Sequence, residues 1–120
     1  MAEPERKRFD APDETRPMQD KGRVEILKIG GGTVGRAVFE PGWKWSDHVR
    51  PIAGTDSCQA AHVGYVLSGR QVVRMDDGTE LELGPGDVVS IPSGHDAWTI
   101  GDEPCVVLDF AGMADYAKRS

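Results

Sequence analysis

Short apolar runs alternate with turn-forming residues along most of this chain, from Val24 to the run that starts at Cys105. The segments between them contain dipeptides such as Pro41-Gly42 and Asp77-Gly78, which favour tight turns. Runs of this length and spacing predict an antiparallel all-β fold, either a sandwich or a barrel. About nine short strands are expected, over residues 24–29, 33–40, 43–50, 58–68, 70–76, 79–83, 88–91, 97–100 and 105–110. Residues 113–120 alone favour a helix.

The first 22 residues differ from the rest because they are charged, contain proline and have no apolar period. They predict an extended N-terminal arm, residues 1–22, that contributes no side chain to the core. Residues 23–120 then form one barrel domain, since a chain of 120 residues is too short for two separate cores. Fifteen glycines and eight prolines also argue against a helix bundle.

The chain carries a formal net charge of −6, and its basic residues form no stripe beyond Arg6-Lys7-Arg8. Binding to nucleic acid or to an anionic membrane is therefore not expected, because both depend on contacts with phosphate groups. No apolar run approaches the roughly 18 residues that cross a bilayer, and the first residues lack the apolar stretch of a signal peptide. These features predict a cytoplasmic protein in which Cys58 and Cys105 are free thiols or metal ligands rather than a disulfide.

The turn residues over 42–98 resemble the two sequence motifs of the cupin family. Gly42 and His48 open the first motif and His62 and Gly69 close it, each pair at the family spacing. Between His48 and His62 the chain has about seven or eight residues more than the family motif. The second is the segment ELGPGDVVSIPSGH, with the glycine, proline and glycine of the motif at positions 86, 92 and 94. The resemblance implies an all-β jelly-roll barrel, also called a double-stranded β-helix, with a metal site inside it. It also implies that two copies pair as a homodimer.

The ligand positions of the two motifs depart from the family pattern. Arg50 stands at the position of the second histidine, and His62 stands at the position of the glutamate. The last histidine position holds Ala97, while His95 lies two residues earlier. Cys58 precedes His62 by four residues and supplies one more metal-binding group. We therefore predict a metal site formed by His48, His62, His95 and Cys58.

Alternation of side chains along a strand supports part of this set. Cys58, His62 and the small residue Gly64 share one face of a strand, an arrangement typical of a pocket wall. His95 shares a face with Ala97 if its strand begins two residues early. Neutral imidazole and thiolate favour zinc, with iron(II) as the second choice. Three protein ligands leave a position open for substrate, whereas Cys58 as a fourth ligand closes the site; Cys58 can equally be a small buried residue.

Three residues are predicted to contact a substrate, and they are Arg50, Trp98 and Trp45. If residues 43–50 form a strand, Arg50 lies on the same face as His48 and needs an anionic partner, which a substrate carboxylate supplies. The alternative is that the chain leaves the barrel at this point and Arg50 is solvated. The tryptophans either line a cavity or pack within the barrel.

Three functions are open at this point. The first is a metal-dependent enzyme of the oxygenase or isomerase type that acts on a small carboxylate-bearing molecule inside the barrel. The second is a non-catalytic module that binds or senses a metal or a small ligand, and the third is a barrel whose histidines are only structural. For a metal site, Asp47 or Asp109 can fix the orientation of an imidazole.

Overall fold

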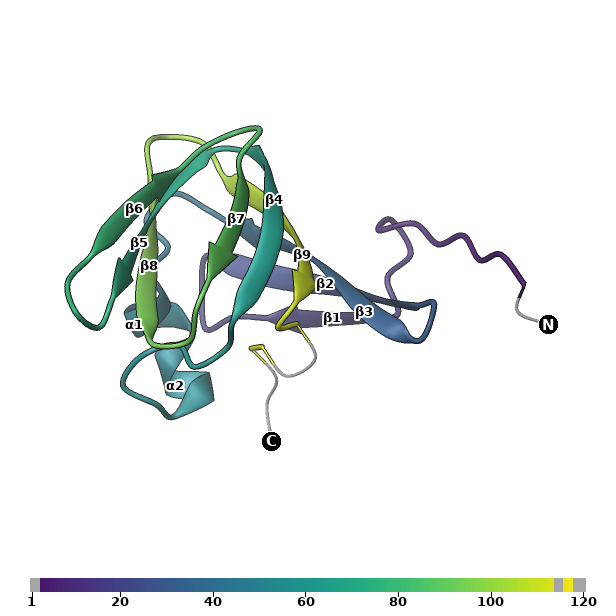
Figure 1. Ribbon diagram of the computed structural model, residues 1–120, viewed down its shortest axis with the longest axis horizontal. Helices are drawn as coiled ribbons and strands as arrows, with labels where there is room; N and C mark the ends of the chain where they lie inside the picture. Colours follow the sequence, from purple (N-terminus) through teal and green to yellow (C-terminus); the bar gives the residue numbers. More distant parts are fainter. Residues whose placement is uncertain (1–2, 114–115, 118–120) are drawn as a thin grey trace.

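The computed structural model describes residues 3–113, 116 and 117 of the chain. These residues form nine strands and two four-residue helices (Figure 1). All of the expected strands are present except the one over residues 43–50, and one strand is added within the N-terminal arm. The elements are β1 (Glu14–Pro17), β2 (Gly22–Ile29), β3 (Gly32–Phe39), α1 (Trp45–His48), α2 (Arg50–Ala53), β4 (His62–Ser68), β5 (Arg70–Met75), β6 (Glu80–Leu83), β7 (Val88–Ile91), β8 (His95–Ile100) and β9 (Cys105–Ala111).

Two antiparallel sheets face each other and enclose the interior of the barrel (Figure 1). The larger sheet has the order β1-β2-β3-β9-β4-β7, and the smaller sheet has the order β6-β5-β8. Strands that are far apart in the sequence are neighbours, such as β3 with β9 and β5 with β8. This arrangement is the predicted jelly-roll barrel, so the fold class is confirmed.

Alternation along the strands places the interior side chains as the sequence predicts. β4 buries His62, Gly64 and Val66 and leaves the residues between them more exposed. β8 begins at His95, two residues earlier than the apolar run, and buries that residue together with Ala97. The two strands belong to different sheets, so these faces meet inside the barrel.

The segment that links β3 to β4 is helical where the sequence predicts a strand over residues 43–50. The N–H of Val49 donates to the carbonyl of Trp45 at 2.9 Å and closes α1, and α2 begins at Arg50. Trp43 and Trp45 are both buried with an exposed residue between them, which imitates the alternation of a strand. The strand prediction is wrong here because each helix is about one turn long and therefore shows no helical period.

Part of the N-terminal arm belongs to the barrel. β1 pairs with β2 at the edge of the larger sheet, and Met18 is buried in the core. The buried guanidinium of Arg16 donates from Nη1 to the carbonyls of Met113 (2.8 Å) and Tyr116 (3.0 Å). The expectation that residues 1–22 contribute no core side chain is therefore wrong, because this arm contacts segments that are distant in the sequence.

The C-terminal segment continues beyond β9 in turns. Met113, Tyr116 and Ala117 lie in such turns, and the rest of the segment 113–120, for which the sequence favours a helix, lies outside the described residues. Among the helices of the described residues, none has the length and apolar character needed to cross a membrane. Both cysteines are free and buried, as the sequence predicts.

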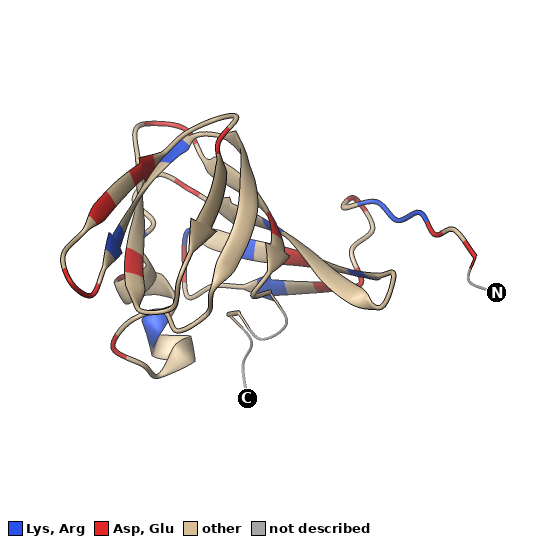
Figure 2. Ribbon diagram, viewed as in Figure 1, with Lys and Arg blue, Asp and Glu red and all other residues tan. Residues whose placement is uncertain are grey.

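Charged side chains are concentrated away from the core. Figure 2 shows acidic residues along β6 and the turn before it, and a basic run on the extended segment that precedes β1. Among the described Asp, Glu, Lys and Arg residues, Arg16 and Asp109 are the buried ones. Arg16 fixes the C-terminal turn, while Asp109 lies in the pocket of the barrel.

Replacement of Gly64 by alanine is expected to destabilise the barrel. A Cβ atom at this position would lie 2.5 Å from the carbonyl oxygen of Leu108 in β9, which is closer than non-bonded atoms approach. We expect Gly64→Ala to lower the free energy of unfolding by about 1–3 kcal/mol, measured by urea denaturation. Gly32→Ala in β3 is the control, since a Cβ there meets no atom closer than 3.8 Å. Equal losses in the two variants would contradict the close approach of β4 and β9.

Candidate metal centre

Three metal-binding side chains converge inside the barrel. One ligand atom from each of Cys58, His62 and His95 lies within 4.8 Å of those from the other two. Sγ of Cys58 is 3.8 Å from Nε2 of His62, and the two imidazole rings have their centroids 5.5 Å apart. All three residues are buried. The structure therefore brings together three of the four residues predicted to bind a metal.

A carboxylate fixes the orientation of His62. Nδ1 of His62 lies 2.6 Å from Oδ2 of Asp109, and both side chains are buried. The other oxygen of Asp109 accepts the backbone N–H of Ala111 at 2.9 Å. With its Nδ1–H donated to Asp109, the ring of His62 presents Nε2 to Cys58, the tautomer that a metal-binding histidine requires.

The backbone holds His95 and Cys58 side by side. The N–H of Cys58 donates to the carbonyl of His95 at 2.7 Å, and the N–H of Gly94 donates to the carbonyl of Cys58 at 2.7 Å. Nδ1 of His95 lies 2.9 Å from the carbonyl of Pro92, so its other ring nitrogen, Nε2, is the one available to Cys58. The loop after α2 thus returns to the barrel, where it places the thiol beside the histidine that starts β8.

The protons of Cys58 and His62 are coupled. Burial opposes the thiolate, but hydrogen bonds to His62 and His95 outweigh this effect and lower the pKa of Cys58 to about 6. Burial also opposes the imidazolium, yet the bonds to Asp109 and Cys58 raise the pKa of His62 to about 9. Both shifts favour a thiolate paired with an imidazolium in the metal-free protein, and the thiolate is the form that binds metals.

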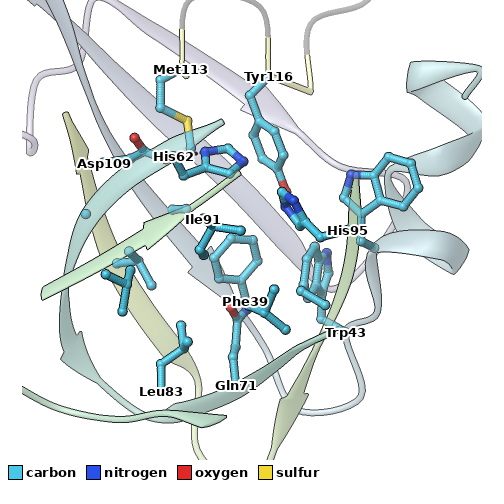
Figure 3. A pocket seen from close by; sticks show the side chains of 17 residues that line it. Phe39, Trp43, His62, Gln71, Leu83, Ile91, His95, Asp109, Met113 and Tyr116 are labelled. Atoms are coloured by element: carbon cyan, nitrogen blue, oxygen red, sulfur yellow. Dashed lines mark hydrogen bonds and ion pairs between the residues drawn. The ribbon is translucent and has the colours of Figure 1, made fainter. Parts of the chain in front are cut away.

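A partly open pocket lies next to these donors. His62, His95 and Asp109 belong to its wall, and most of the remaining wall is apolar (Figure 3). The ring of Tyr116 meets the ring of His62 edge to face, with their centroids 5.2 Å apart. Two of the three donors, His62 and His95, therefore line an internal pocket of the barrel.

The three donors suit a divalent transition metal. Two ligands of a tetrahedral zinc ion lie roughly 3.4–3.8 Å apart, given Zn–N and Zn–S bonds of about 2.0–2.3 Å. Small rotations of the side chains bring atoms that now lie within 4.8 Å to these separations. Each imidazole already has the outer hydrogen bond that metal-bound histidines need, to Asp109 for His62 and to Pro92 for His95.

His48 does not belong to this group. It is the last residue of α1, and its Nδ1 contacts the backbone of Lys44 at 3.0 Å. The sequence placed it with the other histidines because a strand over residues 43–50 would have turned it inward. The helical path of this segment leaves it partly exposed instead.

The predicted substrate-binding residues are divided between the inside and the outside of the barrel. Trp45 lines the pocket. Arg50 starts α2, where its half-exposed side chain donates from Nη2 to Asp56 at 3.2 Å. Trp98 lies on the face of β8 opposite to His95, outside the wall of the pocket, with the ammonium of Lys44 5.6 Å from the centre of its ring.

The sequence prediction missed several residues of the pocket wall. Gln71 shares a face of β5 with Val73, and both are buried, so strand alternation alone could have identified it. Met113 and Tyr116 follow the last strand and reach the pocket through the turn that Arg16 fixes. No local pattern in the sequence reveals that contact, because it joins the two ends of the chain.

Known proteins with a similar sequence pattern or structure share one fold. A family model described as the cupin domain matches residues 56–111. A sugar phosphate isomerase of the cupin superfamily from Silicibacter pomeroyi has 21% sequence identity and a TM-score of 0.63, over 88% of this chain and 73% of that chain. The polyketide cyclase RemF from Streptomyces resistomycificus has 20% identity and a TM-score of 0.64, over 91% of this chain and 79% of that chain.

A third similar structure is a cupin-like protein from Thermotoga maritima. Its sequence identity is 22% and its TM-score is 0.53, over 79% of this chain and 71% of that chain. Among curated proteins, no sequence matches this chain. At identities of this size the structural likeness identifies the fold, and the activity has to be argued from the site.

The thiolate of Cys58 is expected to form at an unusually low pH in the metal-free protein. Because hydrogen bonds to two histidines lower its pKa to about 6, the ultraviolet absorbance of thiolate should rise as the pH increases through that value. Cys58→Ser should remove this transition, whereas Cys105→Ser should keep it, since burial raises the pKa of Cys105 to about 12. A transition that survives in Cys58→Ser would contradict the assigned hydrogen bonds.

Proposed function

The chain belongs to the cupin superfamily, and we propose that it is a metal-binding cupin that holds a small molecule next to the ion. One observation carries this proposal: Cys58, His62 and His95 have ligand atoms within 4.8 Å of one another, and the two histidines line a pocket. Two of these donors already have outer partners that fix their tautomers. Buried clusters of this composition are typical of metal sites.

We propose zinc as the first choice of ion and iron(II) as the second. One thiolate and two imidazoles form a donor set that zinc favours, while imidazoles alone would suit several metals equally. Cys58 therefore favours zinc. A bound divalent ion would polarise an oxygen atom of the substrate. His62 and Asp109 hold the proton at Nδ1 of the imidazole, and the apolar wall limits the entry of water.

The open pocket favours an enzyme over a module that only stores or senses a metal. An ion held by three protein donors would keep a coordination position free, and two of these donors, His62 and His95, line the pocket. Reactions of the isomerase or oxygenase type fit such a site, since both need a substrate oxygen or dioxygen beside the ion. The carboxylate predicted for the substrate loses its support, because Arg50 pairs with Asp56 outside this pocket.

We further propose that the protein is a cytoplasmic homodimer. Two free cysteines suit a reducing compartment. An exposed apolar face covers the outside of β7, β4 and β9, where Val88 is 76% exposed and Phe110 is 55% exposed. β7 is also an edge strand of the larger sheet. An apolar face beside a free strand edge supports two-fold pairing of identical chains.

Loss of any of the three donors is expected to reduce the metal content sharply. The unaltered protein should contain about one divalent transition ion per chain, measured by elemental analysis after reconstitution and gel filtration. Cys58→Ser, His62→Ala and His95→Ala should each remove most of it. His48→Ala is the matched control and should keep the full content, because His48 lies outside the group.

Two results would contradict the metal site. The first is an unaltered protein that retains no metal after reconstitution with zinc(II) or, without oxygen, with iron(II). The second is a loss in His48→Ala as large as that in His62→Ala. Far-ultraviolet circular dichroism of each variant separates a lost ligand from a lost fold.

A charge on the apolar face is expected to separate the dimer. Val88→Lys places a cation on the exposed side of β7, so burial against a second copy would become unfavourable. We expect the unaltered chain to sediment with the mass of two chains and Val88→Lys with the mass of one. Leu81→Lys is the control, because Leu81 is 52% exposed on β6 in the other sheet. An unaltered chain that sediments as a monomer would rule out this pairing.

A further inference from the structure

Two polar groups buried in the barrel lack a hydrogen-bond partner among the described residues. They are the indole Nε1–H of Trp45 and the side-chain amide nitrogen of Gln71. Trp45 is 2% exposed and Gln71 is 4% exposed, so solvent outside the barrel hardly reaches them. Leaving a buried donor unpaired costs about 1–3 kcal/mol. Such groups are rare in native proteins, and a ligand that pairs with them removes the cost.

Both residues line the pocket that adjoins the metal donors. Gln71 comes from β5 and Trp45 from α1, whereas His62 comes from β4 in the other sheet. Figure 3 shows Gln71 reaching into the pocket from the side opposite to His62 and Tyr116. A molecule that lies beside the metal donors can therefore extend towards Gln71.

The wall between these polar groups is apolar and partly aromatic. Phe39 and Trp43 line it with their ring centroids 4.3 Å apart, and Tyr116 lines it beside His62. Leu83 belongs to the same wall, on the side of Gln71 (Figure 3). Aromatic walls of this kind favour a flat, apolar ligand that packs against their faces and edges.

The charges at the metal centre balance without a charged ligand. A divalent ion contributes +2, the thiolate of Cys58 contributes −1, and Asp109 contributes −1, while both imidazoles bind the ion in the neutral form. The described residues of the wall include no lysine or arginine. An anionic group that lay away from the ion, on the side of Gln71, would lose its hydration and meet no lysine or arginine.

We infer that the pocket binds a neutral aromatic molecule that carries an oxygen acceptor, such as a ketone, and that Gln71 and Trp45 donate hydrogen bonds to it. This inference rests on the proposed function, because it names the class of molecule bound beside the proposed ion. It replaces the carboxylate-bearing substrate with a ligand that the interior of the barrel can accommodate. The apolar wall binds the ring, and the two donors select for the oxygen.

Binding of three related probes tests the class of ligand. Acetophenone has a ring and a neutral carbonyl, benzoate has the same ring with a charged carboxylate, and toluene has the ring alone. Dissociation constants are measured on the zinc-loaded protein by ligand-observed NMR. We expect acetophenone to bind at least about fivefold more tightly than toluene, as one hydrogen bond would give, and more tightly than benzoate.

Matched variants test the two donors. Gln71→Leu removes the amide and keeps a similar volume, and Trp45→Phe removes the N–H and keeps an aromatic ring. Each should weaken acetophenone by about fivefold and leave the binding of toluene nearly unchanged. Gln19→Leu and Trp98→Phe are the controls, since both of these residues lie outside the wall of the pocket. Neither control should change the binding of acetophenone.

The inference is overturned if benzoate binds as tightly as acetophenone, if none of the probes binds, or if Gln71→Leu and Trp45→Phe bind acetophenone like the unaltered protein. In the last case the two donors hold water only. Metal content measured on the same samples keeps the two proposals apart. Full metal content with no preference for acetophenone refutes the ligand class alone. A preference for acetophenone in protein that retains no metal after reconstitution refutes the metal site alone.

Discussion

The candidate site depends on one buried hydrogen bond, in which Nδ1 of His62 meets Oδ2 of Asp109 at 2.6 Å. This bond joins β4 to β9, and the two strands approach closely because Gly64, which faces Asp109 in the register, has no side chain. The second carboxylate oxygen accepts the N–H of Ala111, so both oxygens of this buried charge are hydrogen-bonded. The pairing of two strands thereby sets the tautomer of His62 and directs its Nε2 towards Cys58.

The other half of the site joins Cys58, which lies in the loop after α2, to His95, the first residue of β8. Arg50 and Ala97 stand at positions where the cupin motifs carry histidines. Cys58 and His95 supply metal-binding groups in place of these two histidines. Hydrogen bonds between the backbones of Cys58 and His95 hold the thiol beside the imidazole. α1 and α2 take up the additional residues between β3 and β4, and this detour carries His48 away from the other donors. The longer segment between β3 and β4 thus accounts for both differences from the cupin motifs: it removes His48 from the group of donors and adds Cys58 to it.

Strand alternation predicted the parts of the site that lie on strands. It placed His62 and His95 inside the barrel, and both are there. The same rule places Trp98 on the opposite face of β8 from His95, so the choice of Trp98 as a pocket residue, made from its chemistry, conflicted with the geometry. Alternation failed over residues 43–50, where one-turn helices imitate a strand. It also could not show that Arg16 fixes the C-terminal turn, because that contact depends on how the two ends of the chain meet in space.

The distribution of charge decides what such a barrel can hold. The cation that the sequence offered for a substrate, Arg50, is neutralised by Asp56 at the surface, while a carboxylate, Asp109, lies inside. A low-polarity interior penalises an unpaired ion far more than it penalises a neutral dipole. The interior therefore rejects anions through desolvation, and it favours a neutral ligand whose oxygen pairs with Gln71 and Trp45. Under the proposed function, selectivity would have two sources in one cavity: the charges around the metal donors would disfavour an anion, and the unpaired donors of Gln71 and Trp45 would favour a ligand oxygen.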